Sequence, residues 1–343
     1  MPGSRSVYIN GRFLCQKATG VQKFALGISR SLQKNHAEYI VILPKGMSDT
    51  HGLQVRQSGW GGGTLWEQLW LPLFFLVHPG SVLINFCNTA PLLLHRQVVT
   101  IHDLAFLKDR NWFSPAFRRW YRFLIPKICI KSLCVLTVSA IIKNEITEAF
   151  SVAHEKIKVI PNGIQEMDVD EQKPYPFRYL FMTGIYNPRK NAAFIISLLP
   201  EIKKRNYHIV GVGADDGIYG TTEFIQDDHL HLMKYVDDRH YYTLMKHADA
   251  LVYPSEYEGF GIPLLEALIL GTSVIVPDIP VYRESFGTMP IYYTAGSECS
   301  FIQCLDKLNN IKPTKEESFF LKNKYNFDKS ADILTNIVKQ YLQ

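Results

Sequence analysis

The 343 residues of the chain are 47% hydrophobic and 20% charged, a balance that excludes a disordered protein and suits two domains of about 150 residues each. No signal peptide is expected, because the first residues contain no charged segment followed by an apolar run. The longest apolar stretch, LWLPLFFLV at 69–77, is too short to span a bilayer, for which about 20 apolar residues are needed. Six cysteines without a CxxC pair favour reduced, buried thiols in a cytosolic protein over disulfides or a zinc site.

Charge is distributed unevenly along the chain. Residues 1–170 contain 19 Lys and Arg against 11 Asp and Glu, whereas residues 171–343 contain 18 against 21, so the halves carry +8 and −3. A basic first half indicates an anionic partner for it, which could be a membrane surface, a nucleic acid or a phosphorylated substrate.

Short β-branched or apolar runs alternate with helical segments from the start of the chain. Strands are predicted in the first half at 6–10, 39–44, 81–86, 97–103, 134–140 and 156–164. Helices are predicted between them at 20–34, 65–77, 114–132 and 140–150. This alternation is typical of a parallel sheet with helices on both faces.

The alternation begins again after a polar, proline-containing stretch at 165–178, which is interpreted as a linker. Strands of the second half are predicted at 179–184, 207–213, 229–233, 250–255, 273–278 and 290–294, and helices at 190–205, 238–247, 263–270 and 298–310. Two such units predict an α/β protein of two Rossmann-like domains facing a cleft, at 1–166 and 167–327. Ligands of such sheets bind beyond the carboxyl ends of the strands.

The segment SEYEGFGIPLLEALILG at 255–271 places a carboxylate, Glu266, in the middle of an otherwise apolar helix. A buried carboxylate costs several kcal/mol unless it is paired or hydrogen-bonded. One interpretation is a structural ion pair. The other is that Glu266 accepts hydrogen bonds from the hydroxyls of a ligand, for which a vicinal diol is the natural partner.

A glycine-rich turn precedes this helix and contains a second carboxylate, Glu258. Backbone amides ahead of a helix start form a polar site suited to hydroxyls and anions. The amides expected to point at a ligand are those of Gly259, Phe260 and Gly261.

EGFGIPLLEA at 258–267 resembles the Glu-x7-Glu signature of the retaining glycosyltransferases of family 4, which have the two-domain GT-B fold. Further segments are similar to those of the family and occur in the family's order. They are ATGVQKFALGISRSL (18–32), TIHDLAFL (100–107), TVSAIIKNEI (137–146), VIPNGI (159–164), MTGIYNPRKN (182–191) and SVIVPDIPVYRE (273–284). The resemblance covers nearly the whole chain, and it implies that a terminal helix at about 328–343 packs back on the first domain.

The resemblance implies a nucleotide-diphospho-sugar donor, whose diphosphate needs cations. Arg189 and Lys190 follow a predicted strand and turn, and two cations at a helix amino terminus oppose the macrodipole, so anion binding is favoured over a solvated helix start. There they would stabilise the negative charge that grows as the glycosidic bond breaks. The resemblance also implies that amides near Gly184 and Gly20 approach the phosphates, which glycine permits.

The same resemblance gives the other donor contacts. It implies that Glu266 holds the ribose hydroxyls, and that Glu258 and the amides of 259–261 hold the sugar. The base would lie against MKYVDD at 233–238, with Tyr235 and Val236 as its contacts.

His102 ends a predicted strand in the first domain. From the residues alone, a structural histidine and a catalytic one remain open, and the resemblance places it at the donor sugar. For the neighbouring Asp103, a capping role is the alternative. The predicted catalytic residues are therefore His102, Arg189, Lys190 and Glu258.

The implied reaction retains the configuration at the anomeric carbon. The acceptor hydroxyl attacks from the face of the leaving group, and the departing phosphate oxygen takes its proton, so no protein base is required. No acidic DxD pair stands at a strand end near the site, so no essential metal and no cofactor are expected. A non-catalytic protein of the same fold that binds a nucleotide sugar or a polyanion is the alternative.

The segment WFSPAFRRWYRFLIPKICIKSL at 112–133 interleaves cations and aromatic residues at near-helical spacing. It suits a helix lying on an anionic membrane, although Pro126 leaves core packing equally open. The resemblance fits transfer of a hexose, for which similar short relatives suggest mannose, to a polyprenyl-diphosphate-linked saccharide of lipopolysaccharide O-antigen, capsule or exopolysaccharide. We therefore expect a cytoplasmic enzyme, peripheral on the inner face of the cytoplasmic membrane. Nucleic acid is not an expected partner, because no groove-reading or base-stacking motif is present.

Overall fold

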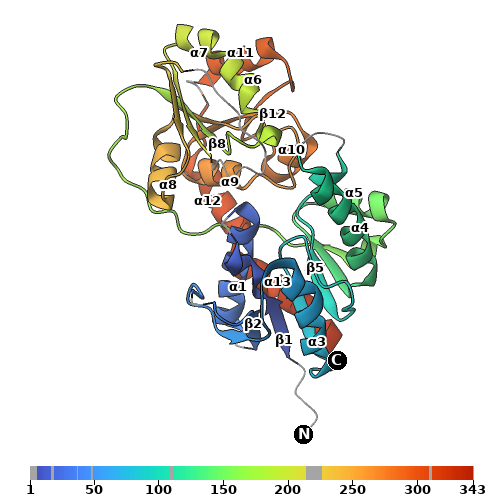
Figure 1. Cartoon of the computed structure of the whole chain (residues 1–343). Helices are drawn as coiled ribbons and strands as arrows, with labels where there is room; N and C mark the ends of the chain where they lie inside the picture. The colour runs from blue at the N-terminus through green and yellow to red at the C-terminus, as the bar shows by residue number, and fades with distance from the viewer. Residues whose placement is uncertain are drawn as a thin grey trace. The chain divides into compact units, whose positions relative to one another are not determined.

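The computed structural model describes residues 6–16, 19–36, 38–47, 49–108, 112–213, 226–308 and 311–342. The chain divides into two compact units (Figure 1). Unit 1 comprises Met1–Leu107, Arg118–Ile164 and Tyr325–Gln343. Unit 2 comprises Lys108–Phe117 and Gln165–Lys324.

A parallel sheet of seven strands forms the centre of unit 1, in the order β3-β2-β1-β4-β5-β6-β7. The strands are β1 (Val7–Asn10), β2 (Tyr39–Leu43), β3 (Val55–Gln57), β4 (Val82–Asn85), β5 (Gln97–Thr100), β6 (Cys134–Thr137) and β7 (Ile157–Val159). All residues of β1, β4, β5 and β6 are buried, as expected for parallel strands with both faces covered. All the strands predicted in this half are found, and β3 is an additional one.

The helices of unit 1 cover the two faces of this sheet. They are α1 (Gly20–Asn35), α2 (Gly63–Leu65), a π-helical turn η2 (Trp66–Trp70), α3 (Leu71–Leu76), α4 (Pro115–Lys131), which begins in unit 2, α5 (Ala140–Phe150) and α13 (Phe327–Leu342), with short 3₁₀ turns η1 (Gly11–Cys15), η3 (Ala105–Leu107) and η4 (His154–Lys156). Val7 and Ile9 pack in one core cluster with α1 and α13, whereas Tyr8 packs in another with Trp66 and Phe74. The alternation along β1 therefore assigns α1 and α13 to one face, and α3 to the other.

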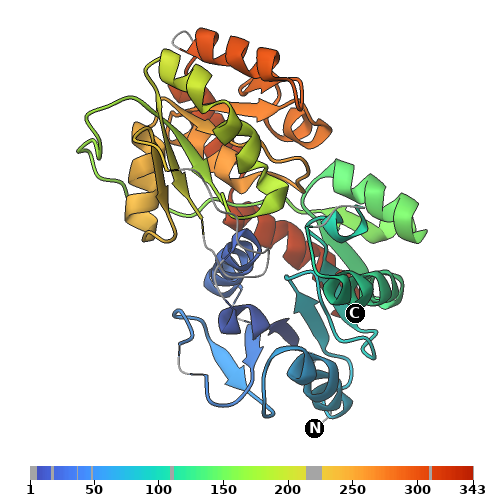
Figure 2. The same ribbon diagram turned by 45° about the horizontal axis from the view of Figure 1, so that its top comes forward.

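The terminal helix α13 runs beside α1 in both views (Figure 1, Figure 2). A Cβ atom added to Gly27 of α1 would lie 2.3 Å from the ring of Phe327, so only glycine allows this approach. Ser31 donates a hydrogen bond of 2.6 Å to Asp328, and the hydroxyl of Tyr39 donates one of 3.0 Å to Thr335. These contacts fix the end of the chain within unit 1.

Unit 2 has a second parallel sheet, of six strands in the order β10-β9-β8-β11-β12-β13. The strands are β8 (Tyr179–Thr183), β9 (His208–Val212), β10 (Leu230–Met233), β11 (Ala250–Val252), β12 (Ser273–Pro277) and β13 (Ile291–Tyr293). Its helices are a 3₁₀ turn η5 (Pro188–Lys190), α6 (Ala192–Ser197), α7 (Leu199–Lys204), α8 (Asp238–His247), α9 (Ile262–Ile269), α10 (Pro280–Phe286), α11 (Glu298–Lys307) and α12 (Lys315–Lys324). The architecture of two Rossmann-like parallel-sheet units is thus confirmed.

The structure also bears on the predictions about the cysteines and about membrane-spanning helices. All six cysteines are free thiols, but only Cys129, Cys134 and Cys304 are buried, and Cys15 and Cys299 are exposed. Among the described residues, no helix combines the length and the apolar character needed to cross a membrane.

Candidate active site

The parallel direction of the strands brings two loops of unit 2 to one edge of its sheet. β8 and β11 are parallel neighbours, and the strand order reverses between them, because β9 and β10 lie beyond β8 while β12 and β13 lie beyond β11. The loops that follow β8 and β11 contain residues 184–191 and 253–261. Such a reversal point, at the carboxyl ends of the strands, is where open α/β sheets bind ligands.

A carboxylate and two cations meet in these loops. Nη1 of Arg189 lies 3.1 Å from Oε2 of Glu258, and Nζ of Lys190 pairs with Oε1 of the same carboxylate. The side chains of Arg189, Lys190 and Glu258 are 15%, 13% and 9% exposed. Three of the four predicted catalytic residues therefore form one nearly buried cluster, whose formal charge is one positive.

Neighbouring groups hold Glu258 in place. The hydroxyl of Ser255 donates a hydrogen bond of 2.6 Å to Oε1, and that of Tyr253 donates one of 3.2 Å. Nη1 of Arg189 also donates to the carbonyl of Tyr257 at 2.8 Å. Ser255 and Tyr253 were not predicted as site residues, because the sequence does not show that they point at the carboxylate of Glu258.

Electrostatics keep this carboxylate ionised. Burial by itself raises the pKa of Glu258. Arg189 and Lys190, together with the hydrogen bond from the Ser255 hydroxyl, lower it by more than burial raises it, and the resulting pKa is about 2. An ionised carboxylate only accepts hydrogen bonds. Glu258 is therefore suited to binding hydroxyls and unsuited to acting as a general acid.

The pKa of Glu258 predicts a pH-dependent contribution to stability. Because its pKa is lowered on folding from the ordinary 4.5 to about 2, the stabilisation is complete above pH 4.5 and is lost as the pH falls towards 2. Relative to wild type, Glu258→Gln is expected to lower the free energy of unfolding by about 3 kcal/mol near pH 7. This difference between the two proteins should become smaller as the pH is lowered below 4.5. Urea unfolding of both proteins across this range measures the difference, and a difference independent of pH contradicts the assignment.

The glycine-rich turn leads into α9 as its sequence predicts. Gly261 is the N-cap residue with φ +104°, and an added Cβ would lie 3.0 Å from the ring of Tyr282. Pro263 lies in the first turn, and Gly271 follows the helix end with φ +78°. Phe260 is buried against Phe286, with ring centroids 5.5 Å apart, and Gly259 is buried beside it.

Glu266, in the middle of α9, is 5% exposed. The hydroxyl of Tyr242 in α8 donates a hydrogen bond of 3.0 Å to its Oε1. Burial, and next the Glu266 carboxylate, raise the pKa of Tyr242, so this hydroxyl keeps its proton. Tyr242 therefore links α8 to the site residue Glu266 in α9. The only signal for Tyr242 in the sequence is a weak one, namely that it lies in the helix that follows the predicted base-binding segment.

The remaining predicted donor contacts of unit 2 have different surroundings. Gly184 follows β8 with φ +69°, and its own amide donates to the carbonyl of Val212 at 2.7 Å, so that amide is used within the protein. Tyr235 is 83% exposed and Val236 is half-buried between β10 and α8. No hydrogen bond or ion pair of the described residues links Tyr235 or Val236 to the Glu258 cluster.

His102, the fourth predicted catalytic residue, belongs to unit 1 and follows β5. Its Nε2 lies 2.7 Å from the carbonyl of Phe86, which only accepts, so Nε2 carries the proton. Its ring packs edge-on against Phe24, with centroids 5.0 Å apart. Burial lowers the pKa of His102, although Phe86 and Asp103 act in the opposite direction, so the ring is neutral at pH 7.

Two other first-half residues have structural contacts. Asp103 accepts a hydrogen bond of 2.9 Å from the amide of Ala105, which agrees with the capping interpretation. Gly20 is the first residue of α1 and is exposed, and it lies between the two residues of a capping box, Thr19 and Gln22.

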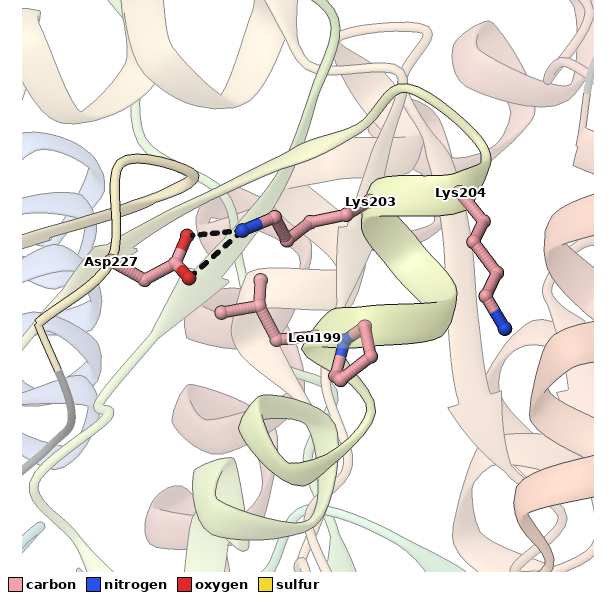
Figure 3. A pocket seen from close by; sticks show the side chains of 5 residues that line it. Leu199, Lys203, Lys204 and Asp227 are labelled. Carbon is pink, nitrogen blue, oxygen red and sulfur yellow. Dashed lines mark hydrogen bonds and ion pairs between the residues drawn. The ribbon is translucent and has the colours of Figure 1, made fainter.

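A pocket of about 250 Å³ lies elsewhere in unit 2 (Figure 3). Its lining includes α7 and Asp227, whose carboxylate is 2.9 Å from Nζ of Lys203. Since α7 leads into β9 and Asp227 precedes β10, the pocket lies at the amino ends of the strands. It contains none of the predicted site residues and is at the opposite edge of the sheet from the Glu258 cluster.

Solved structures show which fold this chain has. WaaG, a glycosyltransferase involved in lipopolysaccharide biosynthesis, matches with a TM-score of 0.68 at 16% identity, over 96% of this chain and 99% of WaaG. Anabaena HepE, solved with UDP and glucose, matches with a TM-score of 0.69 at 13% identity, over 98% of this chain and 100% of HepE. The fold is the GT-B fold of glycosyltransferases.

The sequence comparisons identify the family. The model of glycosyltransferase family 4 matches residues 18–168, and that of glycosyl transferases group 1 matches residues 164–289. The chain belongs to glycosyltransferase family 4, and it is an enzyme of the glycosyltransferase class.

Two curated relatives are mannosyltransferases of O-antigen chains. The O-antigen chain mannosyltransferase RfbU of Salmonella typhimurium is 29% identical over 277 residues, which are 78% of this chain and 76% of RfbU. The O-antigen chain mannosyltransferase B of Escherichia coli is 26% identical over 216 residues, 57% of each chain.

Proposed function

We propose that this glycosyltransferase moves mannose from a nucleotide-diphospho-sugar to a lipid-linked saccharide acceptor in O-antigen biosynthesis, with retention and without an essential metal. The observation that carries this proposal is the pairing of Arg189 and Lys190 with Glu258 at the reversal point of the unit 2 sheet. The similarity to two O-antigen mannosyltransferases supports the choice of sugar and pathway.

The cluster is suited to a reaction whose leaving group is a diphosphate. Its excess positive charge, held in loops with little solvent exposure, attracts an anion more strongly than the same charge in water. As the bond from the anomeric carbon to the phosphate oxygen breaks, Arg189 and Lys190 stabilise the charge on that oxygen. These two cations take the place that a metal ion has in other transferases.

Glu258 and Glu266 bind hydroxyls in this proposal. The low pKa of Glu258 keeps it an acceptor for the sugar hydroxyls, and Glu266 accepts from the ribose hydroxyls beside its bond to Tyr242. The acceptor oxygen then bonds to the anomeric carbon on the face that the phosphate leaves, and its proton passes to the departing phosphate oxygen. His102, neutral and with Nε2 bonded to Phe86, presents Nδ1 as an acceptor for a sugar hydroxyl.

The lipid-linked acceptor requires the enzyme to reach a membrane, and we propose a peripheral place on the inner face of the cytoplasmic membrane. The basic residues of α4 support this. Arg119, Arg122, Lys127 and Lys131 are exposed, whereas Leu124, Ile125, Ile128 and Cys129 are buried. α4 therefore has a packed apolar face and an exposed cationic one, which supports the proposed contact with an anionic membrane.

A panel of nucleotide sugars tests the proposal. One nucleotide-mannose is expected to stabilise the protein most, by about 2.7 kcal/mol at 100 times its dissociation constant, and to be turned over in the presence of EDTA. Nucleotide release should be much slower in Glu258→Gln, and the anomeric proton of the product reports retention. Equal and negligible release by wild type and variant, with donor binding intact, would favour the non-catalytic alternative.

A further inference from the structure

The connection between β3 and β4 has an apolar outer face. Its exposed large side chains, each between 41% and 75% exposed, are Trp60, Leu65, Leu69, Trp70, Leu73, Leu76 and Val77. We call this set the apolar stripe. From residue 65 to residue 77 every exposed side chain belongs to it, so no exposed polar or charged group interrupts the helical run.

The inner face of the same segment is fixed firmly to unit 1. Trp66, Leu71, Phe74 and Phe75 pack in a core cluster with Tyr8. Contacts of this kind exclude a rotation of the segment that would bury the apolar stripe, because the core would then lose four of its large side chains.

The single charged residue of the segment, Glu67, is also on the inner face and is 1% exposed. Its carboxylate pairs with Arg12 at 3.0 Å and accepts hydrogen bonds from Asn10 at 3.1 Å and from Thr89 at 3.0 Å. The polarity of the segment is thus the reverse of a water-facing helix, with its charge inside and four of its five leucines, Leu65, Leu69, Leu73 and Leu76, outside. An exposed apolar surface of this extent indicates a partner.

A cation lies beside the apolar stripe at its first residue, where Nζ of Lys45 is 4.8 Å from the ring centroid of Trp60. The crossovers from β3 to β4 and from β5 to β6 run in the same direction across the sheet, so right-handed connections place α3 and α4 on one face. The exposed cations of α4 therefore belong to the same face as the apolar stripe.

We propose that the apolar stripe inserts in the headgroup region of an anionic bilayer and lies in the membrane plane. Fourteen residues, 63–76, form a rod about 21 Å long, shorter than the hydrocarbon core, so it lies along the surface. A protein interface carries direct hydrogen bonds, and from residue 65 to residue 77 the segment exposes no polar side chain that could make them. Tryptophans within the stripe, and cations beside it, suit lipid headgroups.

This inference deepens the proposed function, because it names the surface that brings the enzyme to a lipid-linked acceptor. It also assigns different parts of membrane binding to α4 and to the apolar stripe. α4 supplies charge but exposes only Phe123 and Ile130 as large apolar side chains, and the apolar stripe supplies the insertion.

Co-sedimentation of the full chain with vesicles tests this inference. Wild type is expected to bind vesicles of phosphatidylglycerol and phosphatidylethanolamine, and Leu69→Glu with Leu73→Glu should weaken binding at least about tenfold. The matched control is Phe319→Glu with Phe320→Glu, two residues of α12 in unit 2 that are 69% and 54% exposed. The control should bind vesicles as wild type does.

Stabilisation by the nucleotide-sugar donor, measured without vesicles, separates the two proposals. The stripe variant should keep the wild-type donor response, since no stripe residue belongs to the donor site. If wild type itself shows no stabilisation by the donor, the proposed function is contradicted, whereas the result of the vesicle experiment still decides the role of the apolar stripe. The inference is overturned if the stripe variant binds vesicles like wild type, or if wild type is a dimer that the stripe substitutions convert to a monomer without any vesicle binding.

Discussion

Replacing Arg189 or Lys190 by alanine is expected to lower donor turnover by on the order of 10²-fold or more, the usual effect of removing one donor to a transition-state charge. Both residues lie in η5, in the loop after β8, and both side chains pair with Glu258. The loss should be in kcat rather than in KM alone, because the charge on the phosphate oxygen grows only as the bond breaks.

A matched control is available in the same unit. Lys203 forms an ion pair with Asp227 at the opposite edge of the sheet and is 39% exposed, so Lys203→Ala should leave turnover unchanged. Thermal melting of each variant shows whether it is folded before its rate is compared. Full activity in a folded Arg189→Ala, Lys190→Ala double variant would remove the catalytic role of the cluster.

Replacing Glu266 by alanine is expected to weaken donor binding by about 10² to 10³-fold, because a carboxylate that accepts two hydroxyl groups loses two charge-assisted hydrogen bonds. Tyr242→Phe is the control for the structural interpretation, since it removes the hydroxyl that donates to Glu266 and keeps the carboxylate. It should lower stability by about 1 to 2 kcal/mol and leave most of the donor affinity.

Calorimetric titration with the preferred nucleotide sugar measures both variants. If Glu266→Ala and Tyr242→Phe lose similar stability and neither loses donor affinity, then Glu266 has a structural role within the α8–α9 contact.

Much of the fold could be predicted because parallel strands that are covered on both faces appear in the sequence as short apolar runs. β1, β4, β5 and β6 are such strands. β3 was missed because its three residues, Val-Arg-Gln, are partly or fully exposed and carry no such signal. The predicted helix at 190–205 is two helices, α6 and α7, since Leu198 leaves the helical conformation and Pro200 lies in the first turn of the next helix.

The residue types of the candidate site could be predicted, but their partners could not. The sequence indicates that Arg189, Lys190 and Glu258 matter, but it does not show that they pair with one another. It also does not show that the amide of Gly184 is used by Val212, because that bond depends on the register of β8 against β9.

The apolar stripe escaped prediction for a related reason. A segment that is apolar on all sides, as 69–77 is, has no periodicity that tells its buried face from its exposed face. Only the packing of Trp66 and Phe74, and the burial of Glu67, show which side faces outward.

The claim on which the account depends is that the carboxylate of Glu266 binds the ribose of the donor. A crystal structure of the protein with its preferred nucleotide sugar tests this directly. The account predicts an oxygen of Glu266 within about 2.6 to 3.2 Å of a ribose hydroxyl, with Arg189 and Lys190 at the diphosphate. A bound donor whose ribose is held by other groups, while Glu266 bonds only to Tyr242 and the rest of the protein, would contradict it.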